Sequence, residues 1–199
     1  GLVGSEMCIR DSHSPSPQIL LAGLESGLKR FIFEGMESGG HIGTLSSFVL
    51  WEQCLEVLEQ RAKEGALPEA SELSILFAGG IHDDLSAVMV QVLCARLAAM
   101  KINCGLQMGT IYLLTKEIVA TKALQPLYQQ VAMETTETRI TGDTVNVRAR
   151  SAPTPYVDWL IDREFERLEE GLPVKQRKLL FEADTVGALR ISARGVIFN

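Results

Sequence analysis

The sequence predicts an α/β fold in which helices cover a parallel sheet. Short apolar runs at residues 31–33 and 75–78 have the length of buried strands, and a third strand is expected at about 102–108. Each run leads into a glycine-containing turn, and a segment with helical apolar spacing follows it. Strands that alternate with helices pair in parallel, so the three glycine turns are expected at one edge of the sheet.

The composition is that of an ordinary globular protein and excludes several kinds of partner. The net charge is −6 and the lysines and arginines are scattered, which argues against nucleic acid or an anionic membrane as the main partner. No apolar run approaches the roughly 20 residues of a membrane helix. The four cysteines form no CxxC pair and no histidine has zinc-ligand spacing, so we expect no metal site and free thiols in a reducing cytoplasm.

The first twelve residues are not expected to be part of the fold. Residues 6–12, EMCIRDS, resemble the translation of an adapter that tags DNA libraries for sequencing, so residues 1–12 are left out of the prediction. This favours the interpretation that the chain is the C-terminal part of a longer protein. Residues 14–17, SPSP, are a predicted linker or loop. A short helix with leucines on one face is expected at residues 19–28.

Helices are predicted after each strand, at residues 46–62, 83–100 and 115–124. Their N-caps are serine (46 or 47), aspartate (83 or 84) and Thr115. The apolar stripes of the first two helices consist of Phe48, Trp51, Leu55, Leu58 and Ala62, and of Val88, Val92, Leu93 and Leu97. The methionines at core-like spacings, which we expect to pack in the interior, are Met89, Met100 and Met108.

The C-terminal third has a different pattern. Alternating residues 138–147 around Gly142-Asp143 are consistent with a hairpin, and prolines 153 and 155 indicate a loop. Helices are expected at residues 156–170 and 174–183, and the charged run DREFERLEE in the first of them is predicted to be a solvated face. Residues 190–198 are left unassigned.

Three glycine motifs carry a resemblance to a known family. They are EGMESGGHIG at 34–43, AGGI at 78–81 and GLQMGT at 105–110. In this order they resemble the nitronate monooxygenase (2-nitropropane dioxygenase) family of FMN-dependent TIM-barrel enzymes, over about residues 19–124. The tail, at 115–141 and 187–195, looks like a subgroup associated with polyketide and polyunsaturated fatty acid synthases, a group that includes enoyl reductases.

The resemblance implies the C-terminal part of a (β/α)8 barrel, in which the three strands are the last three of eight. A full barrel takes about 250 residues, so the first five units would be absent from this chain. The implied domains are a partial FMN-binding barrel at residues 13–124 and a C-terminal extension of hairpin and helices at 125–199.

His41 is the catalytic residue that the resemblance implies. It would act as a general base on the carbon next to a nitro group, or as a proton donor to an enoyl substrate, and an imidazole can do either near neutral pH. The alternative is a turn histidine that only hydrogen-bonds to backbone. Gly39 and Gly40 would allow the backbone to approach the flavin ring. Ser38 stands where the family more often has alanine.

The other two motifs are implied to bind the FMN phosphate, through Gly79, Gly80, Gly109 and Thr110. Glycine backbone N–H groups and a following helix N-terminus suit an anion, although tight strand–helix turns also use glycine. Gln107 would hydrogen-bond to the flavin or fill the barrel interior. For His82 we favour capping or solvent exposure, and Asp83-Asp84 is interpreted as a helix N-cap rather than a pair of catalytic carboxylates.

Three functions remain open at this stage. The first is oxidation of alkyl nitronates by oxygen, with FMN as cofactor. The second is reduction of a carrier-bound enoyl thioester by FMN and NAD(P)H within a polyketide or fatty acid synthase. The third is an inactive or structural portion of a larger synthase, which would contact the other domains of that synthase.

Overall fold

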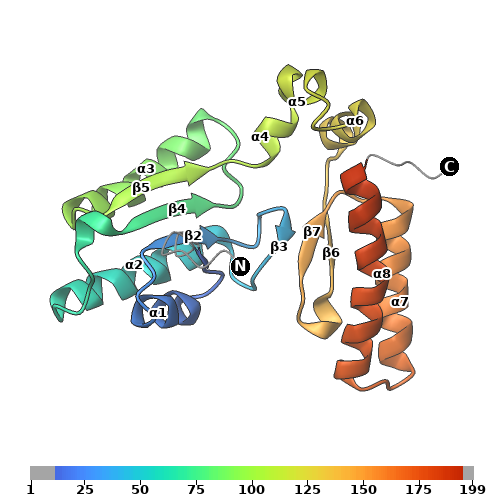
Figure 1. The fold of residues 1–199 in the computed structure, drawn as a ribbon, viewed down its shortest axis with the longest axis horizontal. Coiled ribbons are helices and arrows are strands. Elements are labelled where there is room, and N and C mark those ends of the chain that lie inside the picture. Colours follow the sequence, from blue (N-terminus) through green and yellow to red (C-terminus); the bar gives the residue numbers. More distant parts are fainter. Residues whose placement is uncertain (1–11, 195–199) are drawn as a thin grey trace, which may run out of the picture. The chain divides into compact units, whose positions relative to one another are not determined.

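The computed structural model describes residues 12–194, with side chains as far as residue 186. The chain forms two compact units (Figure 1). Unit 1 comprises Gly1–Ser38 and Ile42–Gly109, and unit 2 comprises Gly39–His41 and Thr110–Asn199. Of the segment 1–12 that was left out of the prediction, residues 1–11 lie outside the described residues, whereas Ser12 is the first residue of a strand that pairs with Phe31.

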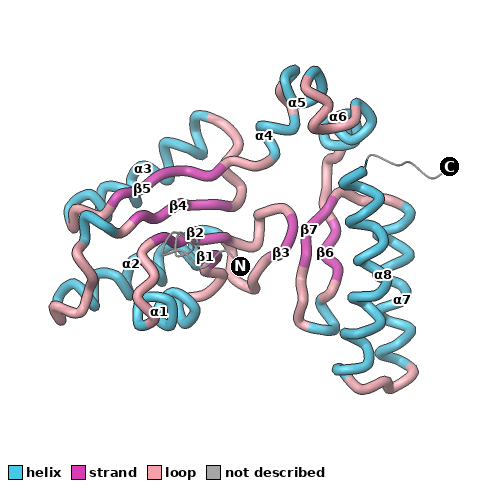
Figure 2. The backbone as a smooth tube through the Cα atoms, viewed as in Figure 1, coloured by secondary structure: helices cyan, strands magenta, loops and turns pink. Residues whose placement is uncertain are grey.

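Unit 1 contains the predicted parallel sheet, so the α/β fold is confirmed. Its four strands are paired in the order β1 (Ser12–His13), β2 (Arg30–Glu34), β4 (Ser74–Ala78) and β5 (Asn103–Gln107), all parallel (Figure 2). Glu34 is in register with Ala78, and Ala78 with Gln107. The three longer strands therefore end level, and the loops that follow them leave from one carboxyl edge.

Three helices pack with this sheet around one core. They are α1 (Pro17–Glu25), α2 (Ser47–Lys63) and α3 (Asp84–Ala99), and a short 3-10 helix, η2 (Ala70–Glu72), precedes β4. Trp51 of α2 lies at the centre of the core, where its Nε1–H donates to the Phe33 carbonyl at 3.0 Å. The Phe77 ring packs edge-on against both Phe33 and Trp51, with centroids 5.7 and 5.5 Å apart.

Parts of the predicted apolar stripes are wrong. Phe48 is 50% exposed, and on α3 the predicted core residues Val88, Met89 and Val92 are exposed as well. The buried residues of α3 are Val90 and Leu97. Helix α3 is apolar on nearly every side, so apolar spacing alone does not identify the side that faces the sheet.

Unit 2 begins with three short helices and continues into an antiparallel sheet. The helices are α4 (Thr110–Leu113), α5 (Lys116–Ala120) and α6 (Pro126–Glu134), so the predicted helix at 115–124 is shorter than expected. The sheet has the order β3 (Gly40–His41), β7 (Ala149–Ser151), β6 (Arg139–Thr141). The predicted hairpin is therefore present, but the 3-10 helix η3 (Asp143–Val145) lengthens its connection and moves the second strand beyond residue 147.

Two antiparallel helices complete unit 2. They are α7 (Pro155–Glu169) and α8 (Val174–Arg194), and α8 extends well beyond the predicted residue 183. The core here consists of Val145, Leu160 and Phe181, with Val147 beside it. Glu164 and Arg167 of α7 are buried, whereas most other residues of the charged run are exposed, so the predicted solvated face is correct only in part.

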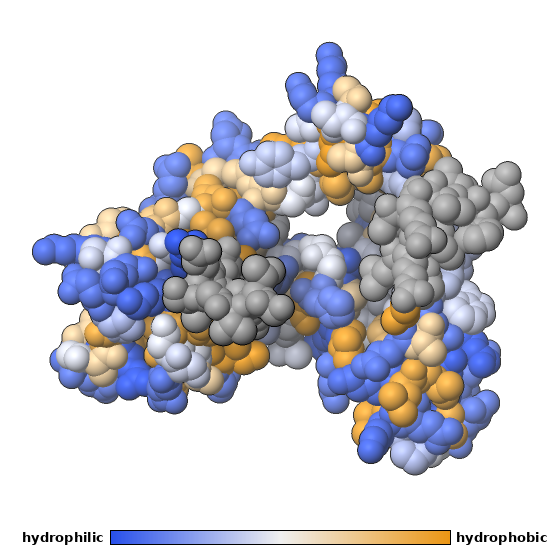
Figure 3. All heavy atoms as spheres, viewed as in Figure 1, coloured by the Kyte–Doolittle hydropathy of each residue, from blue (hydrophilic) through white to orange (hydrophobic). Residues whose placement is uncertain are grey.

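Apolar side chains of this helix pair also reach the surface. In Figure 3, apolar surface lies over the lower part of α7 and α8. The exposed apolar residues of these two helices include Phe165, Leu168, Val174 and Leu179. Among the helices that the structure describes, none combines the length and apolar composition needed to cross a membrane.

Candidate functional site

The loop after β2 packs tightly against the beginning of α2. Gly35 donates its N–H to the Ala78 carbonyl at 3.0 Å, which continues the pairing with β4 beyond the strand end. A Cβ atom at Gly35 would lie 2.3 Å from the Ser47 Cα. Glycine is therefore required at position 35 because the α2 backbone occupies the space of a side chain.

Glu37 supplies the cap that the sequence assigns to serine. Ser46 is the N-cap residue by position, but its side chain makes no capping hydrogen bond. Instead, Glu37 Oε2 accepts from the Ser47 N–H at 2.7 Å and from the Ser47 hydroxyl at 2.5 Å. A carboxylate thus occupies the N-terminus of α2, where the orphan N–H groups and the helix dipole favour negative charge.

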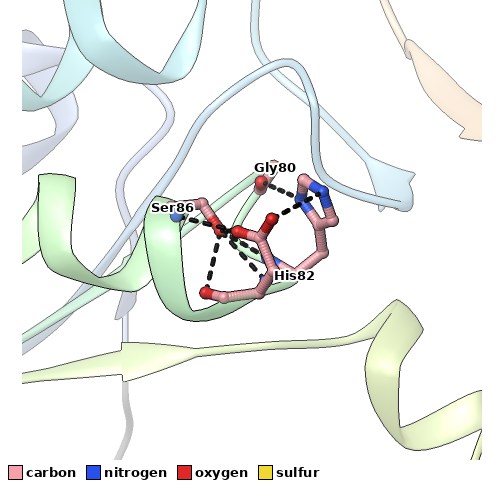
Figure 4. A network of polar contacts seen from close by, with 4 residues as sticks. Gly80, His82 and Ser86 are labelled. Carbon is pink, nitrogen blue, oxygen red and sulfur yellow. Dashed lines mark hydrogen bonds and ion pairs between the residues drawn. The ribbon is translucent and has the colours of Figure 1, made fainter.

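A carboxylate also closes the N-terminus of α3, as the sequence predicts. Asp83 accepts from the Ser86 N–H at 2.8 Å, and Ser86 Oγ accepts from the Asp83 N–H at 3.1 Å, which completes a capping box. The hydrogen bond from the Ser86 hydroxyl, followed by that from its N–H, lowers the pKa of Asp83. Figure 4 shows this network together with His82 and Gly80.

His82 is 67% exposed in its side chain, as favoured from the sequence. Its Nδ1–H donates to the Gly80 carbonyl at 2.9 Å, which fixes the carbonyl direction in the loop after β4. His82 also lies 3.7 Å from the Asp83 carboxylate, so the ring is held between the loop and the helix cap.

The three unit 1 glycines that the sequence assigns to phosphate binding have different surroundings. Gly79 has φ +116°, and a Cβ atom there would lie 2.4 Å from Ser47 Oγ and 3.1 Å from Ser38 Oγ. Gly80 has φ +75°, and a Cβ atom there would lie 3.4 Å from the Glu37 Cβ. Around Gly109 a Cβ atom would meet nothing within 4 Å. Close loop packing therefore explains glycine at 79, whereas space is open at 109.

Backbone donors remain available at this edge. Among the described residues, the N–H groups of Gly79, Gly80 and Gly109 donate to no protein acceptor. Because the N-termini of α2 and α3 already hold carboxylates, the donors left for a ligand belong to the glycine loops. Unpaired backbone N–H groups of successive residues in a turn are suited to bind a phosphate.

The strand ends contribute polar side chains that the sequence analysis missed. Glu34 shares a register position and a sheet face with Gln107, which is exposed. Glu34 is largely buried and pairs with the ring of His13. Strand alternation in β2 could have identified Glu34, but His13 lies in a two-residue strand that has no pattern to detect.

The Gly-Gly-His segment belongs to unit 2, where it forms strand β3. His41 is in register with Ala149 of β7, and Gly40 is in register with Arg150. His41 is exposed, and Cβ atoms at Gly39 and Gly40 would meet nothing within 4 Å. The β3–β7 pairing was not predicted, since a two-residue strand leaves no periodic signal. Thr110 also lies in unit 2, as the first residue of α4.

The site residues predicted from sequence thus divide between the two units. Unit 1 brings Gly79, Gly80, Gln107 and Gly109 to one carboxyl edge, while unit 2 holds Gly39, strand β3 and Thr110. In the part of the chain that the structure describes, no three metal-ligating side chains gather.

The described cysteines form no disulfide. Cys54, Cys94 and Cys104 are free, and Cys8 lies outside the described residues. Burial raises the pKa of the Cys54 thiol to about 12, so this side chain behaves as a small apolar group in the core.

Comparison with known proteins supports the fold. The chain is similar to the structure of FabK from Thermotoga maritima, with 24% identity and a TM-score of 0.62 over 90% of this chain. It is also similar to the M276A mutant of the same protein, with 24% identity and a TM-score of 0.52 over 89% of this chain. The chain spans 47% and 60% of the lengths of these two chains. No protein-family model and no curated protein matches the sequence.

Proposed function

We propose that the chain is part of an FMN-dependent oxidoreductase related to FabK, and that its reaction is the reduction of an enoyl thioester by NAD(P)H. The observation that carries the proposal is the set of unpaired N–H groups at Gly79, Gly80 and Gly109, at the carboxyl edge of a parallel sheet. Cofactor phosphates in barrel folds bind at this edge, in the loops after the last strands. The similarity to FabK structures supports a barrel-type fold for this edge.

The residues at this edge are suited to hold FMN. Gly80 and Gly109 would donate backbone N–H groups to the phosphate, and the space around Gly109 admits a ligand. Gln107, exposed at the end of β5, would donate to or accept from a polar flavin edge. Bound FMN would supply the hydride transfer. The chain would bind the cofactor, orient it and exclude water from it.

His41 is the proton-transfer residue in this proposal. Its exposed ring has no protein hydrogen-bond partner among the described residues, so it is available to a substrate. Reduction of an enoyl thioester requires a proton at the carbon next to the carbonyl, and a protonated imidazole can deliver it. Gly39 and Gly40 leave open space beside the histidine, which a substrate needs for close approach.

Oxidation of alkyl nitronates is the second candidate, and the ordered trio of glycine motifs favours it. His41 would then remove a proton from the carbon next to the nitro group, with oxygen as the oxidant. A structural role within a larger synthase is the third candidate. This candidate is favoured by β5, whose outer edge pairs with no described strand. Because open strand edges are usually covered in proteins, another part of a larger synthase would cover this one.

Two assays on the purified chain separate these candidates. We expect NADPH oxidation that depends on a crotonyl thioester under anaerobic conditions, and no oxygen uptake with propionate-3-nitronate. The variants His41→Ala and His41→Gln should both lose about 10²–10⁴-fold in turnover, because neither side chain exchanges protons. Oxygen uptake with the nitronate alone would replace the first candidate by the second, and purified protein inactive in both assays would support the third.

A further inference from the structure

Glu37 connects three parts of unit 1 that the sequence places far apart. It lies in the loop after β2, its carboxylate binds the first residue of α2, and its methylene groups pack against the loop after β4. The sequence analysis gave it no role.

The carboxylate end of Glu37 is held firmly. Glu37 Oε2 accepts from both the backbone N–H and the hydroxyl of Ser47, at 2.7 and 2.5 Å. Hydrogen bonds to an ionised acceptor are stronger than those between neutral groups, and the dipole of the 17-residue helix α2 adds to them. Ser46, the positional N-cap, contributes no side-chain bond, so Glu37 alone supplies the side-chain cap of this helix.

The methylene groups of Glu37 lie beside the glycine loop. A Cβ atom at Gly80 would lie 3.4 Å from Glu37 Cβ and 3.8 Å from Glu37 Cγ, so these methylene groups occupy the side of Gly80 on which a side chain would project. Next to it, Gly79 lies against Ser47 Oγ, the same hydroxyl that donates to Glu37. The positive φ angles of Gly79 and Gly80 are therefore adopted against a surface made by Glu37 and Ser47.

A buried hydroxyl completes this contact region. Ser38 is 9% exposed, and its Oγ makes no hydrogen bond among the described residues. It lies 3.1 Å from the built Cβ of Gly79, so the loop after β4 is enclosed by side chains from the loop after β2 and from α2. A backbone enclosed in this way has few alternative conformations.

We propose that Glu37 is a positioning residue that holds the Gly79-Gly80 backbone in an anion-binding conformation. Its carboxylate fills the N-terminus of α2, and its methylene groups support Gly80 from one side. By filling that helix end, Glu37 also leaves the glycine-loop N–H groups as the donors for a ligand phosphate. The inference rests on the proposed function only where it concerns FMN.

The test compares the full chain with the variants Glu37→Ala and Glu37→Gln. Hydrogen exchange is measured at the Ser47 amide, and backbone order parameters are measured by NMR at the Gly79 and Gly80 amides. In Glu37→Ala we expect exchange at Ser47 about tenfold faster, since a hydrogen bond to a charged acceptor is lost, and lower order parameters at both glycines. Glu37→Gln keeps an acceptor and the methylene groups, so exchange at Ser47 should stay within about threefold of the original and the order parameters of the glycines should not fall.

Added acetate can replace the missing carboxylate of Glu37→Ala at the N-terminus of α2. A variant that is destabilised for another reason would not be stabilised by acetate in this way. If the empty α2 N-terminus is what loosens the loop, sodium acetate should raise the melting temperature of Glu37→Ala above its value in sodium chloride of equal ionic strength. The unaltered chain and Glu56→Ala, a change at an exposed α2 carboxylate that has no partner in the described structure, should show no such difference. Should Glu37→Ala not fold, its recovery of folding in acetate is the readout.

FMN binding forms the last arm of the test. The dissociation constant should rise about tenfold in Glu37→Ala and little in Glu37→Gln. Unchanged order parameters at Gly79 and Gly80 in Glu37→Ala would overturn the proposal. An unaltered chain that binds no FMN would contradict the proposed function instead, and the order-parameter, exchange and acetate results would still decide the role of Glu37.

Discussion

The two units of this chain bury their residues in different ways. Unit 1 buries large apolar side chains from β2, β4 and three helices, with Phe33, Trp51 and Phe77 in mutual contact. Among its described side chains, unit 2 buries the small apolar cluster of Val145, Leu160 and Phe181 and, in addition, the charged Glu164 and Arg167. Unit 1 therefore depends on apolar packing, whereas unit 2 depends on specific hydrogen bonds and an ion pair.

Glu164 illustrates the polar organisation of unit 2. Its Oε2 accepts from the Gly142 N–H at 2.6 Å, and its Oε1 accepts from the hydroxyl and the N–H of Thr144, at 3.1 and 3.3 Å. Arg167 lies 2.8 Å from the carboxylate of Asp184 and joins α7 to α8. One carboxylate thus joins the connection of the hairpin to α7 by hydrogen bonds. In unit 1, aromatic rings in mutual contact join α2 to the sheet instead.

The largest effect that would test this difference is expected at Trp51. Trp51→Ala removes a side chain that is 1% exposed, so unfolding free energy should fall by about 3–5 kcal/mol. The matched change in unit 2, Trp159→Ala, removes a side chain that is 44% exposed and should cost about 1 kcal/mol or less. Urea unfolding followed by circular dichroism measures both. Equal losses would show that unit 1 does not depend on its aromatic core.

The next effect is expected at Glu164. Glu164→Ala leaves the buried Gly142 N–H without its acceptor, and we expect a loss of about 1–3 kcal/mol in unfolding free energy. Glu169→Ala, at an exposed α7 position with no partner in the described structure, is the control and should change little. Hydrogen exchange at Gly142 locates the effect. An unchanged exchange rate there would contradict the assigned role of the carboxylate.

A glycine pair provides a third test. Gly35→Ala places a methyl group 2.3 Å from the Ser47 Cα, so unit 1 should lose about 1–3 kcal/mol. Gly39→Ala meets nothing within 4 Å and has no positive φ, so stability should stay within about 0.5 kcal/mol. Thermal melts of the two variants give the comparison. A stable Gly35→Ala chain would mean that the loop after β2 is free to move away from α2.

The smallest effect concerns pH and the cap of α3. Hydrogen bonds from Ser86 lower the folded-state pKa of Asp83, so the stabilisation is present above the unfolded-state pKa and is lost as pH falls through the folded-state value. The stability of the unaltered chain should therefore fall more steeply in acid than that of Asp83→Asn, which has no charge to lose. Parallel pH profiles of the two proteins would show that the cap contributes no pH dependence.

The difference between apolar packing in unit 1 and polar contacts in unit 2 explains which features the sequence could predict. Strands β2 and β4 of unit 1 were predictable because apolar runs of strand length lead into glycine, whereas the two-residue β1 was not predicted. The Asp83 cap was predictable because its partner Ser86 is three residues away. The buried side of α3 was not predictable, since Val88, Val90 and Val92 are chemically alike and only packing distinguishes them. In unit 2 the spacing identified α7, but nothing local marks Glu164 and Arg167 as buried.

The candidate site, too, was predictable only where its residues belong to a local sequence pattern. Glycines 79, 80 and 109 were identified by their position after strands, whereas the role of Glu37 depends on Ser47, a residue ten positions away in another element. The pairing of His41 with Ala149 joins residues more than a hundred positions apart, and β3 is too short to indicate it. Local patterns thus indicated the candidate residues, and non-local contacts determine the geometry around them.

The most direct test of the proposed function is an FMN titration of the purified chain, followed by flavin fluorescence. We expect saturable binding of one FMN per chain. Gly109→Leu should weaken the binding by at least about tenfold, because the side chain would fill the open space beside the donor N–H groups. Absence of saturable binding to the unaltered folded chain, or equal affinity in Gly109→Leu, would contradict an FMN phosphate site at the carboxyl edge of unit 1.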